Sequence, residues 1–407
     1  MDRNSRFLLK SFRKYYKENP PELPDRFTKR EFGFMFFDSG MVQRHIGFPN
    51  MDELRRFMIG RVPSHSYYST AYYRKPAAPT MEEKEWLGAE LIFDLDADHL
   101  AGAESMTYSE MLLQIRGEMI RLVDSFLTSD LGFSEKEIHL TFSGGRGYHA
   151  HIPAPSVLGL GTQERRELVD YITCNGLDMD RVFPFQETAL SQMRVGGASR
   201  TSVGRDRLIP EAGSGGWSGK MREGLMGVVN DVCDLDFDVV RRIYPSLKGS
   251  RKSSMESLQK DLRGGRKALF ERNNMAALDR GHQETLVRIM REDVAPRMTS
   301  EIDKPVTPDI KRIIRLPGSV HGKTGLRVTT ITRDQLSGFD PLEDAVPDSY
   351  SDAPTKVTMK RDYEFRMKGE DFRLSGETEV PEYAAVFLVG RKAADYGHLS
   401  ESKEALF

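Results

Sequence analysis

The sequence is poor in cysteine: Cys174 and Cys233 are the only two among 407 residues, which excludes a disulfide framework and a closely spaced pair that could begin a zinc site. It lacks any apolar run approaching the ~20 residues that cross a bilayer. It also lacks a strong net charge, because 59 basic and 61 acidic residues leave −2. We therefore expect a cytoplasmic protein with no membrane segment, which must hold any polyanionic partner through local basic patches.

The most informative stretch is Glu90–Asp98, where an apolar segment ends in a cluster of carboxylates. Asp94 and Asp96 are two positions apart, so on a strand they share one face at a Cα separation of roughly 7 Å. They could then bind the same pair of divalent cations, the usual device for in-line displacement at a phosphorus atom. An acidic strand end is also common on protein surfaces. The two aspartates alone are therefore a weak indication of a metal site, and the rest of the chain strengthens it.

A second informative stretch, residues 138–152, predicts a strand, a glycine-rich turn and a returning strand. Three glycines among residues 144–147 let the backbone approach a ligand, and successive N–H groups in such a turn form an anion site. Arg146 at the tip adds a guanidinium suited to phosphate oxygens. His149 and His151 share a face of the returning strand, so with the aspartates they could instead form a metallohydrolase centre. An ordinary glycine-rich hairpin is the structural alternative.

A third stretch, residues 302–326, combines aspartates, a basic segment and a Ser-x-His-x-Lys turn. Two prolines between Asp303 and Asp309 disfavour a continuous helix and favour an extended backbone at 302–304, beside the acidic strand. Asp309 follows a proline at the expected start of a helix, where a carboxylate stabilises the unpaired N–H groups. Such a density of phosphate-binding side chains indicates a ligand site.

Residues 157–296 differ in predicted secondary structure from residues 1–156 and 297–407, because helical segments alternate with loops and few strand patterns occur. We expect an inserted, largely helical region within a discontinuous catalytic domain. It contains two basic stretches, Arg194–Arg207 and Arg241–Lys267. The second has nine Lys and Arg residues against two acidic ones, a local charge of +7. A solvated basic loop and a contact with a nucleic-acid backbone are equally compatible with this composition.

Other segments have clear local patterns. Arg6–Glu18 has the spacing of a basic amphipathic helix, and residues 30–48 predict a hairpin with Arg44 in its second strand. A broad apolar stripe predicts a helix over 108–128. A further helix is expected over 381–396.

Three motifs, Phe93–Asp96, Ser143–His149 and Arg315–Gly325, occur in an order and spacing that resemble the catalytic small subunit of DNA primase, of the archaeal type. The resemblance extends over nearly all of the catalytic part. It implies a mixed α/β fold of two packed mixed sheets with flanking helices, plus an inserted smaller helical domain. It also implies a nucleotidyltransferase that synthesises short primers de novo on single-stranded DNA, from NTPs or dNTPs, for DNA replication.

The resemblance implies roles for individual residues. Three carboxylates would form a two-metal site for Mg²⁺ or Mn²⁺, namely Asp94, Asp96 and Asp303. The triphosphate of the nucleotide would be bound by Ser143, Arg146, His149, Arg315 and His321, with Arg44 near the site.

The resemblance also has one departure and implies one partner. Most relatives carry a zinc-binding knob after the acidic strand, but residues 97–107 contain no cysteine, so we predict no structural zinc. The family's large subunit bears an iron–sulfur cluster, which two cysteines could not hold here. A heterodimer with that subunit is therefore implied.

Two further functions are compatible with parts of the sequence. One is a repair polymerase of the same superfamily that extends existing ends, and the full-length match argues against it. The other is a catalytically inactive nucleic-acid-binding subunit, which the intact carboxylates disfavour. The metallohydrolase hypothesis leaves the loop at 315–325 unexplained.

Overall fold

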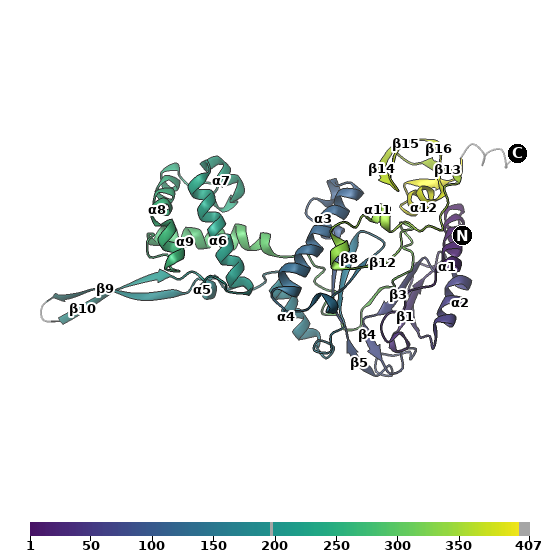
Figure 1. Cartoon of the computed structure of the whole chain (residues 1–407), viewed down its shortest axis with the longest axis horizontal. Coiled ribbons are helices and arrows are strands. Elements are labelled where there is room, and N and C mark those ends of the chain that lie inside the picture. Colours follow the sequence, from purple (N-terminus) through teal and green to yellow (C-terminus); the bar gives the residue numbers. More distant parts are fainter. Residues whose placement is uncertain (196–197, 399–407) are drawn as a thin grey trace. The chain divides into compact units, whose positions relative to one another are not determined.

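The structure is a computed structural model that describes residues 1–195 and 198–398, with the backbone but not the side chains of residues 188–204. It forms two compact units (Figure 1). The first unit consists of Met1–Asp124, Phe133–Val169 and Glu301–Phe407, and the second of Ser125–Gly132 and Asp170–Ser300. The expected domain boundaries at residues 157 and 296 stay predictions about independently folding parts of the chain.

Two four-stranded sheets lie at the centre of the first unit, with strand orders β11-β3-β1-β2 and β12-β7-β8-β6. The first sheet contains β1 (Phe32–Met35), β2 (Gln43–Ile46), β3 (His65–Ser69) and β11 (Ile313–Arg315). The second contains β6 (Leu91–Asp96), β7 (His139–Phe142), β8 (Gly147–Ile152) and β12 (Thr329–Ile331). Tyr68 of β3 stacks on His151 of β8 with ring centroids 6.1 Å apart, so the two sheets face each other.

The mixed α/β fold class is confirmed, and every strand pair that the structure describes is antiparallel. The expected hairpins at 30–48 and 138–152 form, as β1–β2 and β7–β8. A small two-stranded sheet of β4 (Ala71–Tyr73) and β5 (Trp86–Ala89) precedes β6 in the chain.

Helices pack around these sheets. Helix α1 (Arg3–Glu18) begins earlier than expected, because the Asp2 carboxylate accepts a hydrogen bond from the Ser5 N–H and caps it. Phe34 of β1 packs against Phe57 of helix α2 with ring centroids 4.7 Å apart. The other helices of this part are α2 (Met51–Arg61), α3 (Tyr108–Arg121), α4 (Thr162–Ile172), α10 (Arg333–Leu336) and α11 (Pro341–Asp344).

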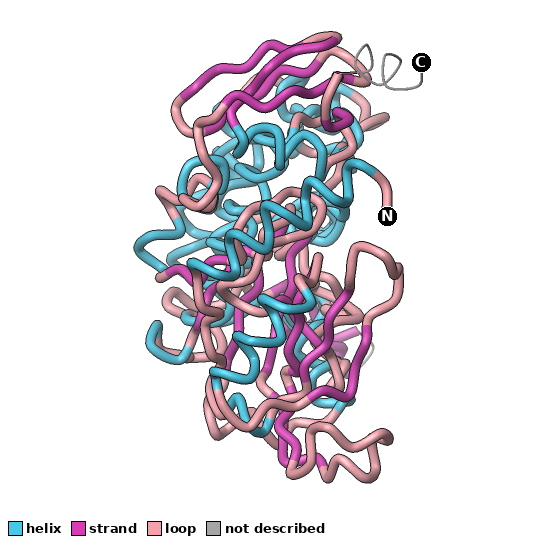
Figure 2. Tube along the Cα trace, turned by 90° about the vertical axis from the view of Figure 1, so that its right-hand side faces the viewer, coloured by secondary structure: helices cyan, strands magenta, loops and turns pink. Residues whose placement is uncertain are grey.

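Residues beyond 350 form further strands and one buried helix. Figure 2 shows strands at one end of the first unit, with helices between them and the larger sheets. The closing helix ends at Gly390 and not near Tyr396, because the chain turns at Lys392 (φ 61°) into a strand. These elements are β13 (Pro354–Met359), β14 (Tyr363–Met367), β15 (Glu370–Leu374), β16 (Glu377–Pro381), α12 (Glu382–Gly390) and β17 (Ala394–Tyr396).

The second unit is mostly helical and carries a long hairpin (Figure 1). The sequence analysis did not expect this hairpin, because its basic and polar residues show no alternation of apolar side chains. The basic stretch Arg194–Arg207 lies in it, largely outside the described side chains. The elements are α5 (Met179–Val182), β9 (Phe185–Val195), β10 (Ala198–Arg207), α6 (Gly216–Asp234), α7 (Phe237–Ile243), α8 (Lys252–Glu271) and α9 (Arg280–Ile289).

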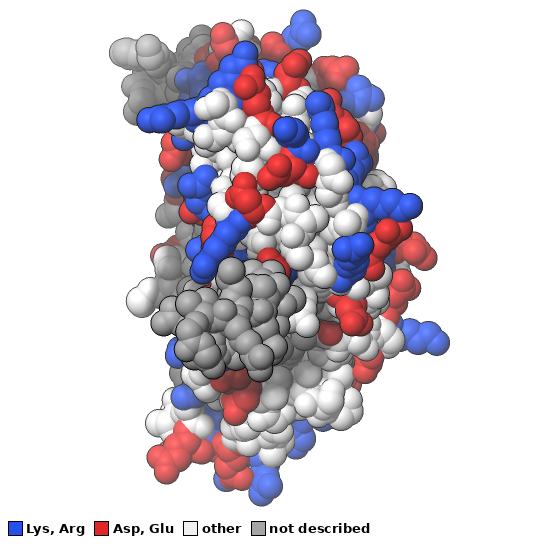
Figure 3. All heavy atoms as spheres, turned by 90° about the vertical axis from the view of Figure 1, so that its left-hand side faces the viewer, with Lys and Arg blue, Asp and Glu red and all other residues white. Residues whose placement is uncertain are grey.

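The basic stretch Arg241–Lys267 is largely helical and not an extended loop, and several of its cations have partners within the second unit. Arg241 donates to the Ser250 carbonyl at 2.8 Å, and Arg263 donates to the Cys233 carbonyl at 2.7 Å. On the face drawn in Figure 3, basic and acidic side chains are interspersed, so that face carries no field of a single sign. In the described parts of the chain, no helix is long and apolar enough to cross a membrane.

Candidate active site

The acidic end of β6 faces a cavity of about 640 Å³ in the first unit. In the antiparallel pairing of β6 with β8, Asp94 lies opposite His149 and Asp96 lies opposite Gly147. Position 147 requires glycine, because a Cβ there would lie 2.2 Å from the Leu95 carbonyl oxygen. The close approach of the two strands thus sets the register that directs both aspartates into the cavity.

A third carboxylate reaches the same place from a distant part of the chain. The Asp303 N–H donates to the Asp94 carbonyl at 2.7 Å, so the backbone at 303 lies beside β6 as expected, although no strand forms there. Asp309 is exposed, and its carboxylate accepts a hydrogen bond from the Lys311 N–H at 3.0 Å. The helix expected to begin at Asp309 is absent, because a short turn leads directly into β11.

The three carboxylates repel one another. Burial, and then the negative charges of Asp96 and Asp303, raise the pKa of Asp94 to about 7. His149 Nε2 lies 3.4 Å from Asp94 Oδ1, but burial and the neighbouring His151 hold the pKa of His149 well below its usual range, so the imidazole is neutral. Clustered carboxylates without a matching cation suit a hard divalent ion, which prefers oxygen ligands.

The carboxylate oxygens do not converge on one point. In the described part of the chain, three potential metal ligands lie within 4.8 Å of one another at one place, which is Asp261, Asp279 and His282 in the second unit. The oxygens of Asp94, Asp96 and Asp303 do not meet this distance criterion.

The glycine-rich turn forms the next part of the cavity wall. Ser143 Oγ accepts hydrogen bonds from the N–H groups of Gly145 and Gly147, both at 3.3 Å, which leaves its hydroxyl proton available to a ligand. Gly144 has φ 75°, and a Cβ on it would lie 2.8 Å from His321 Cβ. Arg146 lines the cavity and forms an ion pair with Asp98. The turn is therefore packed tightly against the loop that carries His321.

Arg315 and His321 complete this wall. Arg315 Nη2 donates to His321 Nε2 at 3.1 Å, and the guanidinium lies over the Tyr67 ring with Cζ 4.6 Å from its centroid. Burial and the neighbouring Arg315 hold the pKa of His321 well below its usual range. A half-buried cation beside a neutral imidazole is an arrangement that can bind an anion.

Of the nine predicted site residues, seven line this cavity, namely Asp94, Asp96, Ser143, Arg146, His149, Arg315 and His321. Asp303 is not among the lining residues, but its N–H donates to the Asp94 carbonyl and its charge acts on the Asp94 carboxylate. Arg44 does not line it. Its guanidinium donates to both carboxylate oxygens of the buried Glu31, at 3.0 and 3.1 Å, and to the Lys311 carbonyl at 3.3 Å.

Several residues of the cavity were not predicted from the sequence, namely Tyr67, Asp98, Arg312, Lys323, Arg391 and Lys392. Lys323 lies within the motif Arg315–Gly325, and Asp98 ends the acidic stretch. Arg391 and Lys392 follow α12 and have no local pattern that marks them. His65, whose Nδ1 lies 2.6 Å from Arg315 Nη1, was not predicted either.

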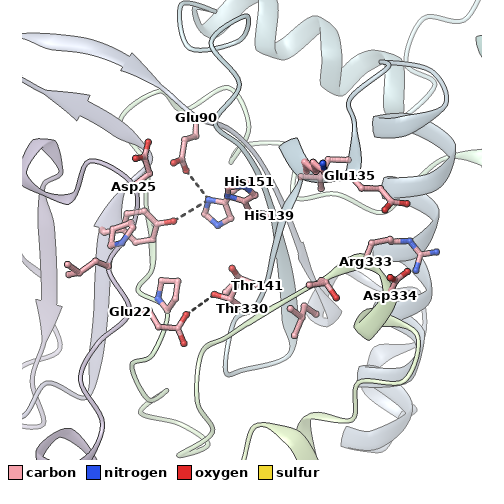
Figure 4. Close-up of a pocket in the computed structure, with 18 residues that line it drawn as sticks. Glu22, Asp25, Glu90, Glu135, His139, Thr141, His151, Thr330, Arg333 and Asp334 are labelled. Carbon is pink, nitrogen blue, oxygen red and sulfur yellow. Dashed lines mark hydrogen bonds and ion pairs between the residues drawn. The ribbon is translucent and has the colours of Figure 1, made fainter.

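His151 belongs to a different environment, although it shares a strand face with His149. It lines a second cavity, of about 680 Å³, which Figure 4 shows. Its Nδ1 lies 3.1 Å from Glu90 Oε2 and 3.3 Å from the Tyr68 hydroxyl. Glu90 in turn pairs with the buried Arg30. The two histidines and the aspartates therefore do not assemble the metallohydrolase centre that the sequence left open.

Comparison with known proteins identifies the family to which this fold belongs. Residues 93–333 match the DNA primase small subunit family. The chain is 39% identical over 403 residues to the DNA primase small subunit PriS of Methanococcoides burtonii, covering 98% of this chain and 100% of that protein. It is 40% identical to the subunit of Methanosarcina barkeri, covering 98% of both chains. The subunit of Picrophilus torridus is 37% identical, over 95% of this chain and 97% of that protein.

The matched segment includes β6, the glycine-rich turn and the 315–325 loop, and so contains the cavity's main elements. The chain belongs to the DNA primase small subunit family.

Proposed function

We propose that this chain is the catalytic subunit of a DNA primase, which joins nucleotides de novo on single-stranded DNA for DNA replication. The observation that carries the proposal is that carboxylates and cations line the same cavity. Asp94 and Asp96 line it together with Arg146, Arg315 and the glycine-rich turn, and the backbone of Asp303 lies beside Asp94. A nucleoside triphosphate with divalent cations matches both kinds of group.

The carboxylates would hold two Mg²⁺ or Mn²⁺ ions. The raised pKa of Asp94 supports this, because a cation would relieve the repulsion from Asp96 and Asp303. Bound divalent ions supply activation of the attacking oxygen and stabilisation of the leaving one. The protein's own contribution is to hold the carboxylates on a rigid strand edge, whose register Gly147 fixes.

The cationic and hydroxyl groups of the cavity would bind the triphosphate and then the departing pyrophosphate. Arg315 and Arg146 offer guanidinium groups, which suit phosphate oxygens, and Ser143 offers a hydroxyl proton. Cationic donors of this kind stabilise the charge that develops on the leaving group. His149, which is neutral and lies 3.4 Å from Asp94, can orient that carboxylate or donate to the ligand.

A primase of this class also needs partners. We propose a heterodimer with a large subunit that bears an iron–sulfur cluster, since Cys174 and Cys233 could not hold one. That subunit would help to place the first nucleotide, and single-stranded DNA would be the template. The sequence and charge indicate a cytoplasmic protein, and no structural zinc is proposed.

The proposal is tested by incubating the purified chain with single-stranded DNA, Mg²⁺ or Mn²⁺, and NTPs or dNTPs, without any primer. We expect new oligonucleotides, and none from the Asp96→Asn variant as the matched control. Extension of an annealed primer without initiation would instead favour the end-extending repair polymerase. Template binding without synthesis under either condition would favour an inactive binding subunit.

A further inference from the structure

Arg315 is a half-buried cation whose hydrogen-bond partners include two histidines. Its Nη1 lies 2.6 Å from His65 Nδ1, and its Nη2 lies 3.1 Å from His321 Nε2. Within the described part of the chain, no carboxylate lies within ion-pair distance of this guanidinium. Charges withdrawn from water are usually paired, so a half-buried arginine that is held by neutral groups at a cavity wall is prepared for an anion from outside.

The partners of each histidine assign its tautomer. His65 Nδ1 accepts hydrogen bonds from Arg315 and from the Gly322 N–H at 3.2 Å, so its ring proton lies on Nε2. His321 Nε2 accepts from Arg315, so its proton lies on Nδ1, where Thr324 Oγ1 lies at 3.3 Å. Thr324 in turn donates to the Gly144 carbonyl at 2.5 Å. A continuous set of hydrogen bonds therefore links the glycine-rich turn to Arg315.

Both rings are held close to the backbone around them. The ring centroids of His65 and His321 lie 4.7 Å apart in an edge-to-face arrangement. A Cβ on Gly322 would lie 2.9 Å from His65 Nε2 and 2.7 Å from the Ser64 carbonyl oxygen, so the loop approaches β3 closely. Burial, and then the charges of Arg315 and Lys323, lower the pKa of His65 to about 2. His65 thus stays an uncharged acceptor at any working pH.

We propose that His65 is a positioning residue that holds Arg315 as a fork aimed at the phosphates of the incoming nucleotide. A carboxylate in this position would fix the guanidinium equally well but would neutralise it. An imidazole nitrogen orients the guanidinium and leaves its positive charge for the anion. The proposal deepens the proposed function and rests on it, because the anion is taken to be the nucleotide triphosphate.

The test compares three substitutions of His65. His65→Asn keeps an acceptor oxygen near the position of Nδ1, whereas the oxygen of His65→Gln lies one bond farther out, and His65→Leu has no acceptor. We expect His65→Leu and His65→Gln to raise the nucleotide KM about tenfold, with kcat changed less than about threefold. His65→Asn should stay within about threefold of the parent chain in both constants.

A double-mutant cycle separates positioning from general damage to the fold. In an Arg315→Gln background, His65→Leu should add little to the rise in KM, since the group that it positions is gone. An equal effect of His65→Leu with and without Arg315 would overturn the proposal. So would an Asn variant that is as impaired as the Leu variant.

Calorimetric binding of inorganic tripolyphosphate without metal keeps the inference independent of activity. We expect the affinity to fall about tenfold in the Leu and Gln variants and to be retained in the Asn variant. If the parent chain makes no primers but shows this pattern, the proposed function fails and the positioning role of His65 stands. Unchanged affinity in the Leu variant would overturn the role even in an active primase.

Discussion

Glu90 and Asp94 are acidic residues four positions apart on the same face of one extended segment, and their electrostatic environments are opposite. Glu90 contacts His151 (Figure 4) and pairs with the buried Arg30. Although burial acts to raise its pKa, Arg30 lowers the pKa to about 2. Asp94 meets Asp96 and Asp303, and its pKa rises to about 7. One carboxylate is paired within the fold, and the other is left for a ligand.

The arginines show the same contrast. Arg30 donates to the carbonyls of Asp25, Ser69 and Thr70, at 2.9 to 3.0 Å, and pairs with Glu90. Arg315 has only neutral acceptors among its hydrogen-bond partners. Arg30 and Glu90 pair directly with each other and have structural roles, whereas Asp94 and Arg315 line one cavity and act on each other without forming an ion pair, so both remain available to a ligand.

The largest expected effect is the loss of activity when a carboxylate of the cavity is removed. Asp94→Asn and Asp96→Asn should each lower primer synthesis by about a thousandfold or more, because each removes a metal-ligating charge worth several kcal/mol in the transition state. Circular dichroism and gel filtration would establish that both variants fold. Near-normal synthesis by either folded variant would contradict their assignment.

The second effect is a difference between Glu90 and Asp94 in their contribution to the stability of the fold. Glu90→Gln should lower the free energy of unfolding by about 3–5 kcal/mol, because it leaves the Arg30 charge buried without its partner. Urea unfolding of this variant beside Asp94→Asn measures the contrast. A Glu90→Gln protein as stable as the parent chain would mean that the Arg30–Glu90 pair contributes little to the fold.

The third effect is a difference in pH dependence. Because the folded-state pKa of Asp94 is raised, the folded chain keeps a proton between about pH 4 and 7 that the unfolded chain has lost, so stability falls as pH rises through this range. Glu90 acts oppositely, and its contribution is lost as pH falls from about 4.5 towards 2.

Asp94→Asn should therefore stabilise the metal-free chain at pH 8 by roughly 1–3 kcal/mol, a range reduced because 16% of the side chain is exposed. Unfolding in the presence of a chelator at pH 5 and pH 8 checks this. A variant less stable than the parent at pH 8 would show that Asp94 is already neutralised within the fold.

The smallest effect concerns the phosphate end of the cavity. Arg146→Ala and His149→Ala should raise the nucleotide KM about tenfold and leave template affinity unchanged, because both residues are assigned to the triphosphate. Steady-state kinetics and fluorescence anisotropy with labelled single-stranded DNA measure the two quantities. A loss of template affinity alone would place this turn on the DNA side of the site.

Local patterns predicted much of this site. The alternation of residues along a strand predicted that Asp94 and Asp96 share one face, and it predicted the hairpin with the glycine-rich turn and His149. A spacing of two residues can be read from the local sequence alone. Motif resemblance added Asp303, Arg315 and His321. The role of Arg44 stays a prediction, and its pairing with Glu31 depends on the packing of neighbouring strands, which no local pattern shows. Asp309 was expected at a helix start, since the turn into β11 depends on sheet pairing.

The remaining differences are also tertiary. His65 lies in a tyrosine-rich strand with no motif, and only the loop at 321–324 brings it to Arg315. Arg391 and Lys392 reach the cavity because Gly390 packs against Lys323, where a Cβ would lie 3.1 Å from its carbonyl carbon. The hairpin of β9 and β10 has no alternating apolar pattern to predict it.

The most direct test of the account is Mn²⁺ binding, followed by electron paramagnetic resonance titration, with the parent chain, Asp303→Ala and Asp309→Ala side by side. We predict that Asp303→Ala loses metal binding and primer synthesis together. Asp309→Ala should keep both and lose about 1 kcal/mol of stability or less, because its carboxylate bonds only to its own turn. Loss of Mn²⁺ binding by Asp309→Ala, with binding retained by Asp303→Ala, would contradict the assignment of Asp94, Asp96 and Asp303 as the metal site.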